Sequence, residues 1–110
     1  THWGRDRAHG RFAIPYLVKR QTSDTARAVG LLDRGIIAPG MKADINVIDF
    51  DKLRVNAPTM AFDLPAGGKR LLQSADGYVA TIVSGNVTYR DGRETGALPG
   101  KLVRGPQAAP

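Results

Sequence analysis

Hydrophobic residues recur first at helical spacing and later at the spacing of strands, and the change falls near residue 35. Ile14, Leu17 and Val18 are separated by intervals of three and four residues, so they would share one face of a helix. Pro15 suits the first turn of this helix, where its missing N–H group is not needed. The pattern therefore predicts a short helix that begins just after Phe12.

A second short helix is predicted directly after the first. Residues 22–24, Thr-Ser-Asp, would supply its N-cap and an acidic side chain in its first turn. Ala26 and Val29 would form its apolar face. Gly30 or Gly35 would end it, because glycine readily adopts the left-handed conformation found at helix ends.

The segment 35–49 marks the change from helix to strand. Pro39 and Gly40 predict a tight turn, because proline presets one backbone dihedral and glycine accepts a positive φ. The run Ile45–Ile48 is rich in β-branched residues and is followed by the turn-prone residues 49–51. This combination predicts a buried strand.

Between that strand and residue 70 the hydrophobic pattern has no clear period. Residues 51–68 contain Pro58, Pro65 and a Gly-Gly pair, which predicts a long loop with a short extended piece at 53–55. Residues 70–73, Arg-Leu-Leu-Gln, predict one further strand.

A β-hairpin follows. Tyr78–Val83 contains β-branched residues throughout, and residues 84–86 would turn the chain into a strand at 87–90. Gly85 and Asn86 are expected to take the positive φ angles of that turn. Residues 91–92, Asp-Gly, predict a second turn. The fold class that follows is α+β, with short N-terminal helices before an antiparallel β hairpin and its neighbouring strands.

The two ends of the chain lack periodicity. Residues 1–11 are polar and basic, which predicts a loop whose Trp3 packs against another surface. Residues 106–110 are predicted to be frayed. The length suits one small domain with a limited core.

Composition narrows the class of protein. The 110 residues include no cysteine, so we expect neither disulfides nor a thiolate metal site, and we expect a cytoplasmic location. No apolar run approaches the roughly 18 residues of a membrane span, so we expect a soluble protein without a membrane partner.

The net charge is +6, from 16 Lys and Arg against 10 Asp and Glu. The cations are scattered, and only Lys19–Arg20 and Lys69–Arg70 are adjacent. No aromatic residues interleave with them as stacking platforms for bases. We therefore expect a solvated basic surface and no nucleic-acid partner.

No residues in the sequence have the spacing of a catalytic or metal site. His2 and His9 are seven apart with Asp6 between them, which matches no metal-binding spacing. Ser84 lies in a predicted hairpin turn rather than a strand-to-helix elbow. Gly67–Gly68 lacks the flanking strand and helix of a phosphate loop. The residues alone predict no catalytic group and no metal ligand in this chain.

Two segments resemble a known family. Residues 33–49, DRGIIAPGMKADINVID, resemble the signature G-x-[IL]-x-P-G-x-x-A-D-[IL]-x-[VL]-x-D of the metal-dependent amidohydrolases. Residues 83–92, VSGNVTYRDG, are similar to the final hairpin of the small β-sandwich in that superfamily. Segments 1–7, 63–70 and 95–105 are similar to the end of its D-aminoacylase, or N-acyl-D-amino-acid deacylase, branch.

The resemblance implies a division of the chain. Residues 1–34 would be a loop and the last helices of a (β/α)₈ (TIM) barrel. Residues 35–105 would be the C-terminal portion of a composite β-sandwich, an antiparallel half-sandwich whose other strands come from the N-terminal part of the same enzyme. Residues 106–110 would be a disordered tail.

The resemblance also implies an activity. Such enzymes hydrolyse the amide bond of N-acyl-D-amino acids with a zinc-bound water. The metal ligands and the catalytic aspartate of the family lie on earlier barrel strands, and none of those motifs occurs in this sequence. The chain would thus be a C-terminal structural segment, inactive alone and binding no zinc itself, of an enzyme that is zinc-dependent at full length.

Substrate contact and self-association complete these expectations. His2, Arg5 and Arg7 would follow the last barrel strand near the mouth of the site, where an arginine could meet a substrate carboxylate. They are the predicted substrate-binding residues. Half a sandwich would leave strand edges and apolar faces open, so we expect a homo-oligomer.

Two alternatives remain open. The chain could be the tail of another cyclic-amide hydrolase, of the dihydroorotase or hydantoinase type, because the 35–49 signature is shared by all of them. It could instead be a non-catalytic, β-rich interaction module. The upstream sequence would distinguish these alternatives.

Overall fold

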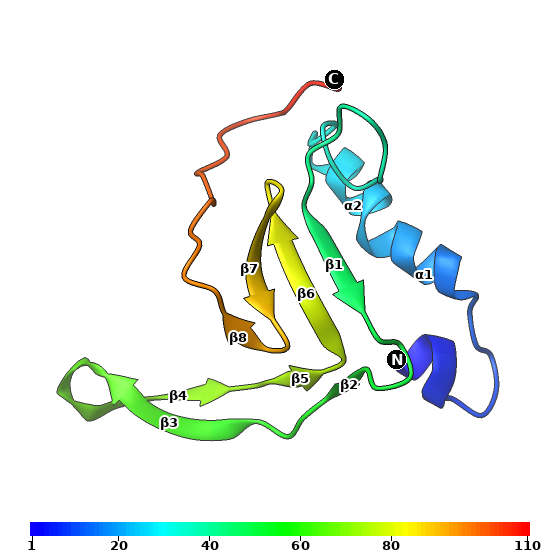
Figure 1. The fold of residues 1–110 in the computed structure, drawn as a ribbon. Coiled ribbons are helices and arrows are strands. Elements are labelled where there is room, and N and C mark those ends of the chain that lie inside the picture. The colour runs from blue at the N-terminus through cyan, green and yellow to red at the C-terminus, as the bar shows by residue number, and fades with distance from the viewer.

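In the computed structural model, which describes residues 1–110, two short helices lie beside three antiparallel sheets (Figure 1). The chain starts with one π-helical turn, η1 (His2–Asp6). The elements that follow are α1 (Ile14–Gln21), α2 (Ser23–Ala28), β1 (Ile45–Ile48), β2 (Arg54–Val55), β3 (Thr59–Leu64), η2 (Pro65–Gly67), β4 (Gly68–Leu72), β5 (Ala75–Asp76), β6 (Tyr78–Val83), β7 (Asn86–Arg90) and β8 (Arg93–Glu94). Helices thus precede antiparallel strands, which confirms the α+β class.

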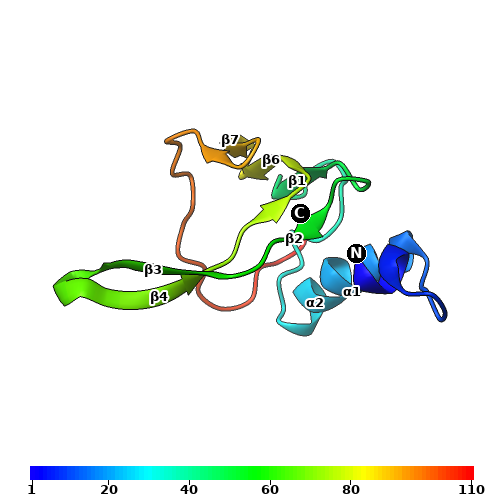
Figure 2. The same ribbon diagram turned by 90° about the horizontal axis from the view of Figure 1, so that it is seen from below.

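The largest sheet has four antiparallel strands in the order β1-β6-β7-β8. The other two sheets are two-stranded ribbons, β2 with β5 and β3 with β4. Figures 1 and 2 both show the β3–β4 ribbon projecting from the rest of the molecule on the side away from the helices. This ribbon and its tip, residues 59–72, are called the arm below.

The predicted helices are present. Thr22 occupies the N-cap position of α2, but its hydroxyl donates to the Val18 carbonyl of α1 at 2.8 Å and caps nothing in α2. Asp24 lies in the first turn, as predicted. Gly30, with φ 75°, follows the end of α2 and is the glycine that terminates it. None of the helices combines the length and the apolar character that crossing a bilayer demands.

Gly35 lets the chain turn away from the helices while its own backbone stays packed against α2. Its φ is 94°, and a Cβ at this position would lie 2.9 Å from the Ser23 Cα atom, so only glycine fits without movement of the backbone. The predicted Pro39–Gly40 turn is confirmed. The Met41 N–H donates to the Ala38 carbonyl at 3.2 Å, across that turn.

The predicted hairpin is confirmed, and its first strand, β6, has the predicted bounds. The positive φ angles fall on Ser84 (50°) and Gly85 (80°), one residue earlier than predicted. The register explains this shift, because Val83 pairs with Asn86 and only two residues remain for the turn. Asp91 and Gly92 form the second predicted turn, with φ angles of 48° and 76°.

The long loop predicted for 51–68 is wrong. Residues 54–55 are strand β2, close to the predicted extended piece, but 59–64 form the complete strand β3. Large apolar residues occupy every second position of Thr59–Leu64, at Met60, Phe62 and Leu64, which is the period of a strand. The prolines on either side of this segment concealed that alternation. The strand predicted at 70–73 is confirmed as β4, which starts earlier, at Gly68.

The N-terminal segment is not a plain loop as predicted. Thr1 accepts hydrogen bonds from the N–H groups of Gly4, Arg5 and Asp6, so residues 2–6 close one helical turn. Gly4 is placed against α1, because a Cβ there would lie 2.5 Å from the end of the Ile14 side chain. The absence of a side chain therefore lets η1 approach α1.

Strand β1 is not buried as predicted. Val47 and Ile48 are 45% and 41% exposed, and only Ile45 of this strand is half-buried. In the whole chain only Ser23, Ala26 and Ala80 are buried. The apolar residues thus have the pattern of a buried strand without a complete core around it.

The dimensions of the molecule agree with this open packing. The accessible surface is 8539 Å², whereas a folded monomer of this mass exposes about 5900 Å². The radius of gyration is 16.6 Å, against about 13 Å for a compact domain of this length. Much of the apolar surface that a compact domain would bury is exposed here.

The C-terminal segment runs back to the helices (Figure 1). The Gln107 N–H donates to the Gly30 carbonyl, and the Leu32 N–H donates to the Gln107 carbonyl, both at 2.9 Å. Leu31 and Gln107 thereby form a parallel bridge. The frayed state predicted for residues 106–110 in solution stays a prediction.

Candidate functional site

Arg34 joins the end of the helical part to the start of the sheet. Its guanidinium donates two hydrogen bonds to the Asp33 carboxylate, at 2.7 and 2.9 Å, and lies 3.5 Å from the carboxylate of Asp44. The hydrogen bonds from Arg34 lower the pKa of Asp33 and raise the pKa of Arg34. These charged residues of the 33–49 signature therefore hold in place the segment that links the helices to the sheet.

Asp44 connects this linking segment to the β6–β7 turn. One of its carboxylate oxygens accepts the Ser84 N–H at 2.8 Å, and the Gly85 N–H donates to the Ala43 carbonyl at 3.0 Å. Strands β1 and β6 then pair directly, with Ile45 opposite Ile82. The two signature-like segments thus belong to one sheet and meet at the β6–β7 turn, with β6 lying between β1 and β7. These contacts give the Asp44 carboxylate a structural role.

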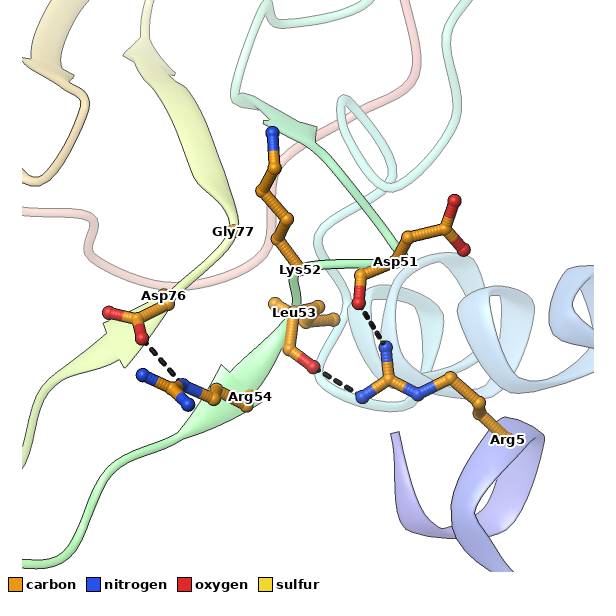
Figure 3. Close-up of a pocket in the computed structure, with 7 residues that line it drawn as sticks. All are labelled: Arg5, Asp51, Lys52, Leu53, Arg54, Asp76 and Gly77. Carbon is orange, nitrogen blue, oxygen red and sulfur yellow. Dashed lines mark hydrogen bonds and ion pairs between the residues drawn. The ribbon is translucent and has the colours of Figure 1, made fainter.

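Arg5 fastens η1 to the connection between β1 and β2. Its guanidinium donates to the carbonyls of Phe50 (2.6 Å), Asp51 (3.0 Å) and Leu53 (2.6 Å). It also lies 5.4 Å from the centre of the Phe50 ring. Figure 3 shows the Arg5 side chain reaching from η1 to the carbonyls of the 51–53 segment.

Asp6 completes the surroundings of Arg5. The Arg5 Nε atom donates to the Asp6 carboxylate at 2.7 Å, and this hydrogen bond, with a smaller one from Thr1, lowers the pKa of Asp6. The hydrogen bonds of the guanidinium therefore all go to acceptors within this chain. A fork of fixed N–H donors suits several carbonyls at once, which a lysine could not match.

His2 and Arg7 pack on the single tryptophan. The His2 ring meets the Trp3 ring edge-on at 5.3 Å, and the Arg7 guanidinium lies 4.2 Å from a Trp3 ring centre. Trp3 in turn contacts Phe12 at 5.9 Å, so the predicted packing of the tryptophan is found within this chain. The substrate-binding role of His2, Arg5 and Arg7 stays a prediction.

An open cavity of about 480 Å³ adjoins Arg5 (Figure 3). Its lining consists of Arg5, Asp51, Lys52, Leu53, Arg54, Asp76 and Gly77. Arg54 donates to the Asp76 carboxylate at 2.6 Å, and this bond, followed by one from Asn56, lowers the pKa of Asp76. The cavity offers paired charges and main-chain carbonyls but no serine, cysteine or histidine that could serve as a nucleophile or base.

Of the predicted site residues, Arg5 alone lines this cavity; His2 and Arg7 do not. Sequence reasoning missed the other lining residues, because Arg54 and Asp76 are 22 residues apart. One signal was available at Gly77. Its φ is 91°, and a Cβ there would lie 2.6 Å from the Leu53 Cα atom, so a glycine is required where the two segments meet.

The side chains of the chain do not assemble a metal centre. No group of three or more His, Cys, Asp or Glu side chains is close enough to hold a metal ion. The carboxylates are used in ion pairs instead; Asp49, for example, lies 2.9 Å from the Lys52 ammonium, whose hydrogen bond lowers the Asp49 pKa. The residues present therefore do not fit a bound zinc ion.

Comparison with known protein families matches residues 2–89 to the family described as "Amidohydrolase family". The matched range includes the helices, the segment around Arg34, the arm and all but the last residue of the β6–β7 hairpin. Searches of curated proteins and of solved structures returned no match.

Proposed function

Because the chain belongs to the amidohydrolase family, we propose that it is the C-terminal structural segment of a zinc-dependent hydrolase acting on N-acyl-D-amino acids. The family match covers residues 2–89 and supports an amidohydrolase, a family that commonly uses metal ions. The choice of N-acyl-D-amino acids is finer than the match and rests on the similarity of segments 1–7, 63–70 and 95–105 to the D-aminoacylase branch.

One observation carries the structural part of the proposal. The 33–49 signature and the 83–92 hairpin lie far apart in the sequence, yet Asp44 and Ala43 hydrogen-bond to the turn at Ser84 and Gly85. The most family-like residues are thus used to connect the helices with the sheet. A role of this kind requires a rigid connection between the helices and the sheet. It does not require a reactive side chain.

The chemical step lies with residues other than those of this chain. The zinc ion that the resemblance implies would polarise the amide carbonyl and activate a water molecule. The side chains described above do not fit that ion, so no step of the reaction is assigned to them. In this proposal the chain supports the barrel that carries the reactive groups.

His2 and Arg7 are the residues we propose near the substrate. Arg7 lies over the Trp3 ring and forms no ion pair with this chain, so its charge is uncompensated locally. A substrate carboxylate could pair with such a guanidinium in a bidentate manner. Arg5 is already engaged by three carbonyls, so we propose that it positions this segment.

The proposal is tested with the complete reading frame that contains this chain. The protein is purified with zinc, and release of the free amino acid is measured from N-acetyl-D-amino acids and from their L-enantiomers. Ring opening of dihydroorotate and of hydantoin is measured in parallel. We expect hydrolysis of the D-substrates at least about tenfold faster than of the L-substrates, and loss of activity on chelation with recovery on zinc addition.

The other outcomes are equally informative. Ring opening without deacylation would place the protein in the dihydroorotase or hydantoinase branch. Absence of every hydrolase activity from a folded, zinc-loaded protein would overturn the enzymatic proposal and favour an interaction module. The separate 110-residue chain serves as the negative control, and hydrolysis by it would contradict the structural role proposed here.

A further inference from the structure

Two arginines face each other at the turn between β7 and β8. Arg90 is paired directly with Arg93 in the register of these strands, so their Cβ atoms lie on one face of the sheet, about 5 Å apart. Both residues are exposed, and neither takes part in an ion pair of the chain. Figure 1 shows β8 at the edge of the sheet, beside β7. Like charges directly opposite each other destabilise a strand pair, so this pairing is unfavourable within the chain itself.

The acidic residues nearest in the sequence do not neutralise the pair. Asp91 lies in the turn itself and forms no ion pair. Glu94 follows Arg93 directly along β8, and successive residues of a strand point to opposite faces, so Glu94 lies on the other face of the sheet. The β2–β5 pair is different, because Arg54 stands opposite Asp76 there and binds its carboxylate at 2.6 Å. The chain thus supplies an acid at one such position and none at the other.

The arginine pair is one end of a row of residues that crosses the whole sheet on one face. Val47 of β1 is paired with Ala80 of β6, and Ala80 is paired with Arg90 of β7. Arg93 of β8 completes the row. Val47, at the other end, is 45% exposed. One half of the row is therefore apolar and the other half is cationic, and a partner lying across the sheet would meet both halves.

The composition of this row determines which partner would fit it. A guanidinium binds a carboxylate or a phosphate through two parallel hydrogen bonds, so two neighbouring arginines suit one anionic group. A free phosphate ion would leave Val47 uncovered, whereas a protein segment with an apolar residue near an Asp or Glu would cover both halves of the row. A second copy of the same face is disfavoured, because it would bring another arginine pair against the first in a chain whose net charge is +6.

We propose that Arg90 and Arg93 together bind the carboxylate of an Asp or Glu side chain in a segment of the complete protein outside these 110 residues. The carboxylate neutralises the pair of like charges, and an apolar residue of the same segment covers Val47. The proposal rests on the proposed function in one respect, that this chain is part of a larger protein. It does not depend on the substrate or on the reaction.

The test introduces Arg93→Glu into the protein made from the complete reading frame and measures melting temperatures at low salt by differential scanning calorimetry. Within the chain alone this substitution replaces a pair of like charges by an ion pair with Arg90, so local contacts predict an unchanged or slightly higher melting temperature. A bound carboxylate reverses the sign, because Arg93→Glu sets a second negative charge against it. We therefore expect the complete protein to melt at least about 3 °C lower. An unchanged or raised melting temperature would overturn the proposal.

Arg104→Glu is the matched control. Arg104 is also exposed and in no ion pair, and the change of charge is the same, but the residue lies outside the row. Its substitution should shift the melting temperature of the complete protein by no more than about 1 °C. An equal decrease in both variants would show an effect of net charge alone and would contradict the proposal.

Added phosphate distinguishes a protein carboxylate from a free anion. At constant ionic strength, phosphate should leave the melting temperature of the complete protein unchanged, because the arginine pair is already occupied. A rise that Arg93→Glu abolishes would show that the pair binds a free oxyanion, and would overturn the proposal. These measurements do not require hydrolysis of any substrate, so failure of the proposed activity and failure of this inference are distinguishable.

Discussion

Arg5 shows how one side chain can determine the path of the backbone. Three carbonyls converge on its guanidinium, and they belong to the segment 50–53 that connects β1 with β2. Without Arg5 the carbonyls of Phe50 and Leu53 would lose a hydrogen-bond donor in a partly buried place. The residue thus holds together two segments that are 45 or more positions apart in the sequence.

Replacing Arg5 by lysine tests this role. Lysine keeps the charge but cannot donate to the three carbonyls in a fixed fork, so we expect Arg5→Lys to lower the free energy of unfolding by about 1–2 kcal/mol. Thermal unfolding followed by circular dichroism measures the change. Arg11→Lys, at an exposed position, should leave the unfolding temperature unchanged.

The same substitution separates positioning from substrate contact. In the active full-length protein, Arg5→Lys should lower stability while leaving KM nearly unchanged. Arg7→Lys should raise KM with little effect on stability, because we propose a substrate carboxylate as its partner. An Arg5→Lys protein of unchanged stability and raised KM would reverse these assignments.

For single residues, the sequence predicted a functional role for the segment 1–7 but could not assign separate roles to its members. Arg5 and Arg7 are two positions apart in a basic segment, and nothing local distinguishes them. Their different partners, main-chain carbonyls for one and the Trp3 ring for the other, depend on contacts formed only after folding. The structural role of Asp44 was predictable, because it stands at the start of a β-branched run.

Among the elements, the arm relies on a cross-strand ion pair near its tip. Arg70 binds Asp63 with two hydrogen bonds, and these lower the pKa of Asp63 and raise the pKa of Arg70. Both groups are exposed to water, so the pair contributes little to global stability. Its main effect is to join β3 to β4 beside the turn at Pro65–Gly67.

A pH titration tests the contribution of this pair. Because the Asp63 pKa is lower in the folded than in the unfolded state, its stabilising effect is complete above the unfolded value of about 4 and is lost as the pH falls through the folded value. We expect Asp63→Asn to melt slightly earlier than the unchanged protein at pH 7. The difference should shrink as the pH falls below about 4 and disappear once the pH is below the lowered pKa of Asp63 in the folded state.

Glu94→Gln is the control for this titration, because Glu94 forms no ion pair in the chain. Its melting temperature should follow that of the unchanged protein at every pH. A difference between Asp63→Asn and the unchanged protein that persists in strong acid would show that the carboxylate acts in another way.

Elements with uninterrupted local patterns were predictable, whereas those defined by distant partners were not. The period of α1 and the β-branched run of β6 each lie within a few residues, and both elements were found where expected. Strand β3 was missed because Pro58 and Pro65 border its alternation. The separation of the arm from the sheet follows from the pairing of β3 with β4 alone, which no short sequence window can reveal.

The whole molecule exposes more apolar surface to solvent than its hydrophobic content suggests. The sequence is 42% hydrophobic, yet only three residues are buried. The half-sandwich that the family resemblance implies would account for this disagreement, since strands that share their core with another segment keep the apolar pattern of buried strands. The sequence could predict the pattern but not the surface left uncovered.

The return of the C-terminal segment to the helices has a practical consequence. Gln107 exchanges two hydrogen bonds with the backbone at Gly30 and Leu32, next to the end of α2. A fluorophore on Ala108→Cys would therefore be carried at the border between helices and sheet, at the only thiol in the chain. Its emission would register when the hydrogen bonds of Gln107 to this border break.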